Sequence, residues 1–527
     1  MSASQQKKLR KSQAAEQQQK MTERQQAELK QQKKVKRMTI AFFVCIALVV
    51  VLAVGALVWN SGLIHRNVTA VSVENYNFSA AQVNYCYVDT VYAAMRDTSS
   101  YLPYFVSTGT PLDEQACAFA SDSTWADYFM DSTVGALEDI SALCAAAEAD
   151  GYTLTEEDQA SIDNTLSYME TYATLSGYSN ADQYLRAYYG NGSNLESYKE
   201  YITMKQLATS YQNKVLADLE ASYTDEQITG YIAEHTTDLT TYTYRMFNIT
   251  ATVLGDLDAA TTAAEDMVEN CKGDEALFIE KTQEYCSEDA AETYAEEDAT
   301  LKSSLGMNLT SEEILAWLSD PARVEGDTTS IAITSTTDGE ETVTGYNVLY
   351  FVEAEDNSYA LANVRHILIQ PENGVTDTNG NTTYSDEDWA AAQKKAEALL
   401  ADWEAGKATE DTFATLANEN SADTGSNENG GLYEDVYPGQ MVTSFNDWCF
   451  DDTRAAGDTG IVKTDYGYHI MYYVGDSETT YAELMAKSEL YNTDAEAWYS
   501  KTTDPFTATR HGFGMSLVNT GLTLTSN

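Results

Sequence analysis

The most constraining feature of the sequence is an internal repeat in its C-terminal half. Residues 316–328, AWLSDPARVEGDT, align without a gap to DWCFDDTRAAGDT at 447–459, a constant offset of 131 residues. The identical positions include Trp317/Trp448, Arg323/Arg454, Gly326/Gly457, Asp327/Asp458 and Thr328/Thr459. A second matching pair follows, GYNVLYFV at 345–352 and GYHIMYYV at 467–474. Because a repeated pattern indicates a repeated structural unit, we expect two tandem α+β modules, at about 240–355 and 360–477.

An apolar segment near the start of the chain predicts a membrane helix. The twenty residues from Ile40 to Trp59 carry no charge, and at about 1.5 Å per residue they match the roughly 30 Å core of a bilayer. A cleaved signal peptide is the alternative, but its apolar stretch is usually shorter. Five Lys and Arg side chains between Lys30 and Arg37 predict, by the positive-inside rule, a cytoplasmic N-terminus. We therefore expect a basic cytoplasmic tail at 1–37, a single-pass cell-membrane helix at 38–60, and the bulk of the chain outside the cytoplasm.

The charge of the chain is strongly asymmetric. There are 31 Lys and Arg against 82 Asp and Glu, a net charge of −51. The first 37 residues carry 11 basic side chains against three acidic ones, which leaves −59 for the remainder. So acidic a surface repels a phosphate backbone, and nucleic acid is therefore an improbable partner. The seven Cys are widely spaced without a C-x-x-C pair, which argues against a disulfide scaffold and a structural zinc site.

The first part of the outer region, 68–238, predicts an all-α domain. Thr155 and Asp158 have the spacing of a capping box that opens an amphipathic stretch. Tyrosines at helical spacing here are interpreted as core residues rather than as a ligand site. The last segment, 478–527, predicts a helix and a tail, and we expect this helix to pack back on the all-α domain.

The second module resembles the parvulin family of peptidyl-prolyl isomerases over residues 363–475. The blocks that carry the resemblance, in family order, are VRHILI (364–369), FATLANENSADTGSNENGGL (413–432), GQMVTSF (439–445) and KTDYGYHIMYY (463–473). The resemblance implies an antiparallel sheet with surrounding helices, isomerisation of X-Pro bonds, and no cofactor. With its anchor and helical domain, the multidomain chain resembles the SurA/PrsA type of foldase, in which the helical part acts as a chaperone.

The resemblance also implies the site residues. It makes His366 and His469 paired core histidines, with Asp423 facing them and Thr464 hydrogen-bonded to the pair. It places Leu432, Met441 and Phe445 in the wall of a proline pocket. Rotation about an X-Pro bond faces a barrier of about 18–20 kcal/mol, which an apolar, water-excluding pocket lowers by favouring the twisted amide. From the residues alone, the two histidines could equally be a buried structural pair, whereas Met441 and Phe445 are core residues and Asp423 is a turn former by default.

The loop at 370–389 departs from one branch of the family. Phosphate-directed parvulins carry a basic loop at this place, whereas this loop has no Lys or Arg, so a preference for phosphoserine before proline is not expected. The loop contains a partial calcium pattern, formed by Asp377, Asn379, Asn381 and Asp388 with Thr382 at the usual Gly position. A solvated hairpin is the favoured interpretation, and no metal site is predicted.

The first module has lost the implied histidines. Asn347 stands at the position of His469, and Met246 at the position of His366. We therefore expect a degenerate module that keeps its fold and serves as a binding surface or as a spacer. Two functions follow for the whole chain. It is either an extracytoplasmic isomerase and foldase for newly secreted, unfolded polypeptides with X-Pro bonds, or a non-catalytic peptide-binding holdase or envelope scaffold. The intact pair in the second module favours catalysis; the sequence indicates neither clients nor an oligomeric state.

Overall fold

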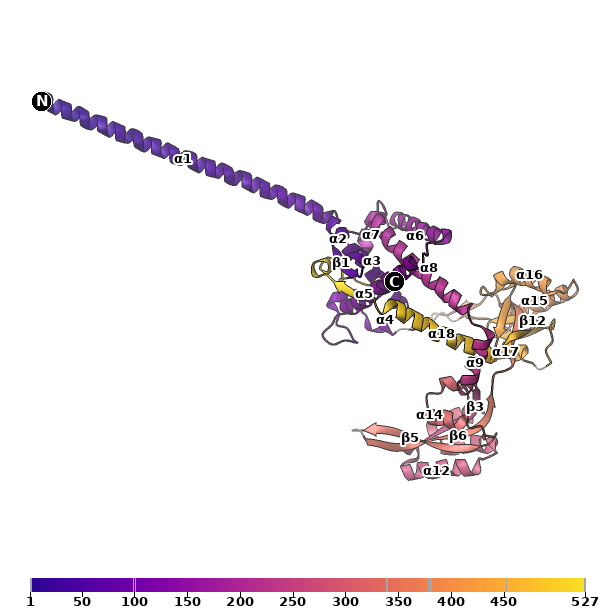
Figure 1. Cartoon of the computed structure of the whole chain (residues 1–527). Helices are drawn as coiled ribbons and strands as arrows, with labels where there is room; N and C mark the ends of the chain where they lie inside the picture. The colour runs from indigo at the N-terminus through magenta and orange to yellow at the C-terminus, as the bar shows by residue number, and fades with distance from the viewer. Residues whose placement is uncertain are drawn as a thin grey trace. The chain divides into compact units, whose positions relative to one another are not determined.

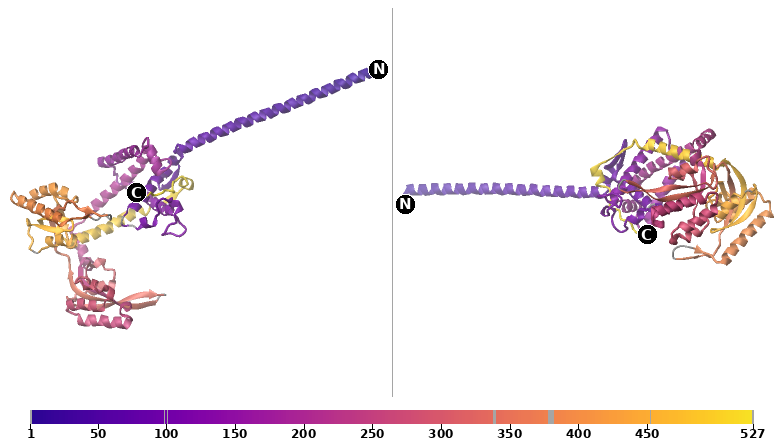
Figure 2. Two further views of the ribbon diagram at one scale, coloured as in Figure 1. Left: turned by 180° about the vertical axis from the view of Figure 1, so that it is seen from behind. Right: turned by 90° about the horizontal axis from the view of Figure 1, so that it is seen from below.

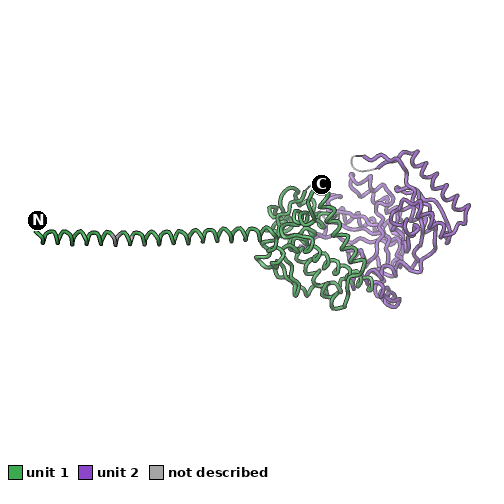
Figure 3. Tube along the Cα trace, turned by 90° about the horizontal axis from the view of Figure 1, so that it is seen from above, with its two compact units in different colours: residues 1–219, 495–527 green, residues 220–494 purple. Residues whose placement is uncertain are grey.

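The structure is a computed structural model that describes residues 2–97, 99, 101–337, 340–377, 382–451 and 453–525. The chain divides into two compact units (Figure 3). Unit 1 comprises Met1–Leu219 and Ala495–Asn527, and unit 2 comprises Glu220–Asp494. The chain leaves unit 1 along α8 (Leu195–Glu220) and returns along α18 (Tyr481–Thr503). The chain therefore passes between the units twice, both times as a helix.

The chain begins with one long helix, α1 (Ala3–Asn60), drawn in indigo in Figure 1. Its segment Lys30–Asn60 is long and apolar enough to cross a membrane, and none of its apolar window is buried in the structure. The expected tail at 1–37 continues the same helix, because it is rich in Gln, Lys, Glu and Ala, all of which favour helices. An ion pair between Lys20 and Glu16, one turn apart, adds to this preference.

Unit 1 is mostly helical, as predicted, but it is not all-α. Its three-stranded antiparallel sheet has the order β13–β1–β2, formed by Ala508–Arg510, Thr69–Val73 and Tyr76–Ser79. The C-terminal strand pairs with β1, with Val71 opposite Arg510. The expectation of an all-α domain is wrong because β1 and β2, at its start, pair with each other and β1 also pairs with a three-residue strand from the far end of the chain.

Helices surround this sheet and bury an aromatic core that includes Tyr85, Trp125 and Phe129. They are α3 (Ala80–Arg96), α5 (Trp125–Ala149), α6 (Glu156–Leu175) and α7 (Ala181–Tyr189), together with α8. The capping box of Thr155 and Asp158 is present at the start of α6. Helices continue to Leu239, through α9 (Asp225–Glu234) and α10 (Thr236–Leu239), close to the predicted residue 238, although both helices belong to unit 2.

Unit 2 contains two four-stranded antiparallel sheets with corresponding strand orders. The first is β4–β3–β6–β5, and the second is β10–β7–β12–β11. The strands of the first are β3 (Thr241–Thr250), β4 (Leu301–Leu305), β5 (Thr328–Thr337) and β6 (Glu340–Glu355). Those of the second are β7 (Ala360–Ile369), β10 (Leu432–Val436), β11 (Thr459–Thr464) and β12 (Gly467–Thr480).

Helices occupy corresponding places in the two chain segments. In the first they are α12 (Leu257–Asn270), α13 (Glu275–Tyr285) and α14 (Glu312–Leu318). In the second they are α15 (Asp386–Glu404), α16 (Glu410–Asn420) and α17 (Thr443–Cys449). The bounds of α14 and α17 differ by the same offset of 131 residues as the repeated sequence.

The repeated sequence forms the same local contacts in both places. The guanidinium of Arg323 lies 4.1 Å from the ring centre of Trp317, and that of Arg454 lies 4.0 Å from Trp448. The Nε of each Arg also donates to the backbone oxygen of its Trp, at 3.0 and 2.9 Å. Each Arg therefore joins the end of a short helix to the loop that leads into the edge strand.

A further repeated contact was not visible in the sequence. Arg245 Nε on β3 donates to Glu275 at 2.6 Å, and Arg365 Nε on β7 donates to Glu410 at 2.9 Å. In each case the Glu is the first residue of a helix, α13 or α16, where a negative charge is favoured. These pairs tie a helix to the same sheet position in both segments.

Candidate active site

Two neighbouring strands bring the two histidines of the second module together. His366 lies on β7 and His469 on β12, where their partners across the ladder are Met471 and Leu368. The two Nδ1 atoms are 2.9 Å apart, and only 3% and 6% of the residue surfaces are exposed. Because a buried polar ring needs a partner, this mutual bond accounts for how two histidines share one core.

A glycine holds the loop that carries Asp423 against β7. The backbone N–H of His366 donates to the carbonyl oxygen of Gly431 at 2.8 Å. Gly431 has φ +70°, and a Cβ there would collide with the carbonyl oxygen of His366, so only glycine fits. The loop then places Asp423 Oδ2 2.9 Å from His366 Nε2.

The hydrogen bonds form one continuous chain, in which each proton has one consistent place. The ionised carboxylate of Asp423 can only accept, so His366 donates to it from Nε2 and leaves its Nδ1 to accept from Nδ1 of His469. His469 Nε2 is then free to accept from Thr464 Oγ1, which lies 2.8 Å away. All four side chains are satisfied with both imidazoles neutral.

The electrostatics agree with neutral histidines beside an ionised carboxylate. Burial lowers the pKa of His469 to about 4; His366 adds to this shift, and Asp423 opposes it. Burial also lowers the pKa of His366, again against the carboxylate. Partial burial would raise the pKa of Asp423, but hydrogen bonds from Ser426, His366 and the Gly425 N–H outweigh it and lower that pKa to about 2.

A cavity of about 250 Å³ opens beside these four hydrogen-bonded side chains. Its lining residues are His366, Leu368, Asp423, Tyr433, Met441, Val442, Phe445, Tyr466 and His469. The Phe445 ring meets both imidazoles edge-on, at centroid distances of 5.5 and 5.3 Å. Met441 and Phe445 thus lie in the wall, as the resemblance implied.

Leu432 is not among the residues that line the cavity, and Tyr433 lies there instead. The Tyr433 hydroxyl donates to Asp423 at 3.1 Å, and its ring lies 5.1 Å from His366. Successive side chains on a strand point to opposite faces, so an assignment one residue off on β10 selects the wrong face. Alternation along LYEDV would have grouped Leu432 with the buried Val436, because the irregular register between Tyr433 and Val436 is not visible in the sequence.

Ser426 and Tyr466 were also missed. Ser426 Oγ lies 3.2 Å from His366 Nε2 and donates to Asp423, so it supports both partners of that contact. Tyr466, 62% exposed, lies in the turn between β11 and β12 and lines the cavity. Ser426 follows Asp423 by three residues in a polar loop, a pattern too common to single it out.

The partial calcium pattern does not assemble a site among the described residues. Asn379 and Asn381 lie outside them. Asp388 Oδ2 accepts from the Ser385 side chain in the capping box of α15, and β8 (Val375–Thr376) pairs with β9 (Thr382–Thr383). Over the described part of the chain, no group of three or more His, Cys, Asp or Glu could hold a metal ion.

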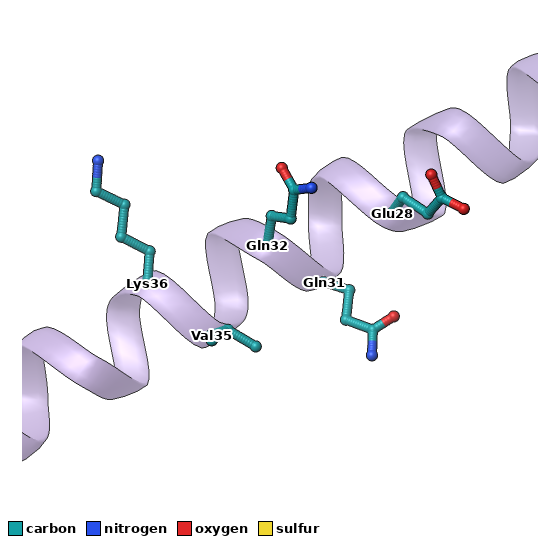
Figure 4. Close-up of a pocket in the computed structure, with 5 residues that line it drawn as sticks. All are labelled: Glu28, Gln31, Gln32, Val35 and Lys36. Atoms are coloured by element: carbon teal, nitrogen blue, oxygen red, sulfur yellow. The ribbon is translucent and has the colours of Figure 1, made fainter.

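A larger hollow, of about 480 Å³, lies on α1. Figure 4 shows its lining side chains, Glu28, Gln31, Gln32, Val35 and Lys36, which project from one helix in different directions. Since no second element faces them, they enclose no ligand. The cavity beside His366 and His469 is therefore the better candidate for chemistry.

Comparison with known proteins agrees with this choice. The family model described as the PPIC-type PPIASE domain matches residues 346–475. Foldase protein PrsA 1 of Listeria innocua is 40% identical over 75 residues, which are 14% of this chain and 26% of that protein. Foldase protein PrsA 3 of Bacillus cereus is 47% identical over 60 residues, 11% of this chain and 20% of that protein. The matched segments thus span about a quarter of the length of these relatives.

Solved structures of the same kind are also similar. PrsA from Bacillus subtilis aligns with 75% of this chain and 92% of its own, at 14% identity and a TM-score of 0.24. Peptidylprolyl isomerase PrsA from Bacillus anthracis aligns with 28% of this chain and 59% of its own, at 20% identity and a TM-score of 0.18. On the family match and the sequence relatives, residues 346–475 belong to the PPIC-type, that is parvulin-type, peptidyl-prolyl isomerases.

Proposed function

We propose that this chain is a membrane-anchored peptidyl-prolyl cis–trans isomerase and foldase that acts on newly secreted polypeptides. The observation that carries the proposal is the unbroken chain from Thr464 through His469 and His366 to Asp423, beside an apolar cavity, within a domain of an isomerase family.

The cavity suits a proline ring more than a polar ligand. Met441 and Phe445 provide apolar walls, and the neutral histidine pair adds no charge beneath them. The planar amide places partial negative charge on its oxygen, so the ionised Asp423 nearby disfavours the planar form relative to the twisted one. In this mechanism the side chains grip the ring, exclude water and weaken amide resonance, and no bond to the protein forms.

We further propose that 240–355 and 360–477 are copies of one parvulin-like module, and that the first copy is inactive. The matching strand orders and the repeated Arg–Trp and Arg–Glu contacts support common descent. Strand register gives the equivalent positions: Ile333 lies opposite Gly345, and Thr464 opposite Gly467. Thus Ile333, Asn347 and Met246 stand where the second copy has Thr464, His469 and His366.

For topology, we propose that the apolar part of α1 spans the cell membrane with the basic end in the cytoplasm. Protease added to intact cells should then digest the chain beyond about residue 65 and leave a short protected N-terminal fragment. Protection of the full-length chain would contradict this orientation. Release of the outer part into the medium without protease would show that the segment is cleaved.

The isomerase proposal is tested with the full chain in detergent micelles. We expect it to accelerate the refolding of a protein whose slow phase is proline isomerisation, because that phase is limited by the X-Pro barrier. Binding of the unfolded protein without acceleration would instead support the holdase or scaffold alternative.

A further inference from the structure

The first module contains an inserted segment that the second lacks. Between the copies the offset is 131 residues up to Ile333 and Thr464, but 122 residues from Gly345 and Gly467 onward. Ile333 lies opposite Gly345, and Thr464 lies opposite Gly467. In each copy these two residues therefore flank the segment whose length differs. Residues 334–344 therefore replace a two-residue turn of the second copy, a net gain of nine residues.

The insertion extends two strands into a ribbon. β5 and β6 stay paired as far as Thr337 opposite Glu340, whereas the pairing of β3 with β6 stops at Gly345. Thr334 Oγ1 donates to Glu341 at 2.9 Å across the extension. In Figures 1 and 2 these strands project beyond the rest of their sheet. We call residues 328–337 and 340–345 the ribbon.

The outer edge of the ribbon is open in unit 2. Among its described residues, β5 pairs with β6 alone. An exposed edge offers unpaired N–H and C=O groups to another extended chain, and proteins usually blunt it with a short strand, Lys or Pro. The equivalent edge strand β11 has six residues and carries Lys463, whereas β5 has ten residues and no Lys, Arg or Pro. Of these two edge strands, only β5, in the copy that lacks the histidines, has none of the features that hinder pairing with another chain.

We infer that the ribbon is a docking edge for an extended, basic polypeptide segment, which adds to β5 as a further strand. The inference rests on the proposed foldase function, which supplies polypeptides in extended form. Strand addition draws its affinity from main-chain bonds, so it suits many unrelated sequences.

Charge selects between the possible occupants. The described residues of the ribbon include Glu340 and Glu341 and no basic residue. This favours a basic segment by electrostatic complementarity. A second copy of this chain is disfavoured, because two acidic ribbons would meet and each chain carries −59 beyond residue 37.

The test uses the full chain in detergent micelles and a short, proline-free peptide of alternating Lys and Val. Without proline, the peptide has no ring for the isomerase cavity. Amide hydrogen exchange over β5 should slow when the peptide is added. The same peptide N-methylated at every second amide should bind about tenfold more weakly, because it has lost the donors on one edge. A Glu-for-Lys peptide should also bind more weakly.

The matched variant replaces residues 334–344 by Asp-Tyr, the turn of the second module. It should bind the Lys peptide about tenfold more weakly, yet isomerise a short X-Pro peptide at the wild-type rate. The control is Glu340→Gln combined with Glu341→Gln. Amide exchange in β5 should still slow when the Lys peptide is added, and only the difference in affinity between the Lys and Glu peptides should become smaller.

Several results would overturn the docking edge. These are unchanged exchange in β5, equal binding of the N-methylated peptide, and a wild-type dimer that the ribbon replacement converts to monomer. The last result would make a second copy the occupant. Absence of isomerisation by the wild-type chain would instead contradict the proposed function, and the exchange measurement distinguishes the two failures.

Discussion

The two modules of unit 2 have corresponding sheets, helices and Arg contacts, yet they differ in the interior of the sheet and in its last hairpin. In the second module, His366 and His469 form a buried polar chain beside a cavity. In the first, Met246 and Asn347 occupy those positions, and the hairpin is nine residues longer. The contacts that repeat hold the fold, and the residues that do not repeat are the ones to which we assign function. On our proposal that the two modules are copies, the first has lost the site residues and kept the residues that hold the fold.

The largest expected effect comes from giving the second module the residues of the first. The variant His366→Met, Thr464→Ile, His469→Asn should lower isomerisation to the uncatalysed rate, because the hydrogen-bonded chain is gone. Its far-ultraviolet circular dichroism should stay close to wild type, since the first module keeps its sheet with these residues. A folded triple variant with substantial activity would show that these three residues do not account for catalysis.

Stability should fall more steeply between pH 6.5 and 4 in the second module than in the first, which has no histidine. The folded-state pKa of His469, about 4, lies below the unfolded value of 6.5, so the unfolded chain binds more protons between these values. The contribution of His469 to the free energy of unfolding is therefore fully present above about pH 6.5. It is lost as the pH drops toward 4, by about 3 kcal/mol. The lowered pKa of His366 acts in the same direction, whereas the carboxyl of Asp423 titrates below this window.

Urea unfolding of fragments 360–477 and 240–355 between pH 4 and 7 measures this difference. The first module contains no histidine, so it provides the matched control. Equal pH dependence of the two fragments would show that the buried pair does not control stability in this range.

A smaller effect is expected from the cavity wall. Met441→Ala removes part of a half-buried apolar side chain. It should raise the activation free energy by about 1 to 2 kcal/mol, which lowers kcat/KM roughly five- to thirtyfold. Thr310→Ala, at the equivalent position of the first module, should leave the rate unchanged. If Met441→Ala combined with Asp423→Ala folds and isomerises at the wild-type rate, the site is wrongly assigned.

The smallest expected effect is the response to phosphorylation. A peptide with phosphoserine before proline should react no faster than its unphosphorylated form, because the loop at 370–389 carries no Lys or Arg. The measurement is a competition between the two peptides at low ionic strength, where a phosphate contact would be strongest. A preference for the phosphopeptide would show that basic groups elsewhere reach the cavity.

Sequence reasoning succeeded where the signal was local and failed where it depended on long-range pairing. The histidines and Asp423 lie in short blocks with family spacing, and the structure brings them within hydrogen-bonding distance. Leu432 was assigned instead of Tyr433 because the face of a strand depends on register. A short strand at 67–79 was expected, but its pairing with β13 was missed because β13 has only three residues and lies at the other end of the chain. The Arg–Glu pairs were missed because their partners lie 30 and 45 residues apart.

The most direct test of the account is the isomerisation rate of one unphosphorylated X-Pro peptide with fragments 360–477 and 240–355, each first shown to be folded. We predict that 360–477 accelerates the reaction in proportion to its concentration and that 240–355 leaves the uncatalysed rate unchanged. Comparable acceleration by 240–355, or none by a folded 360–477, would contradict the assignment of catalysis to the histidine chain of the second module.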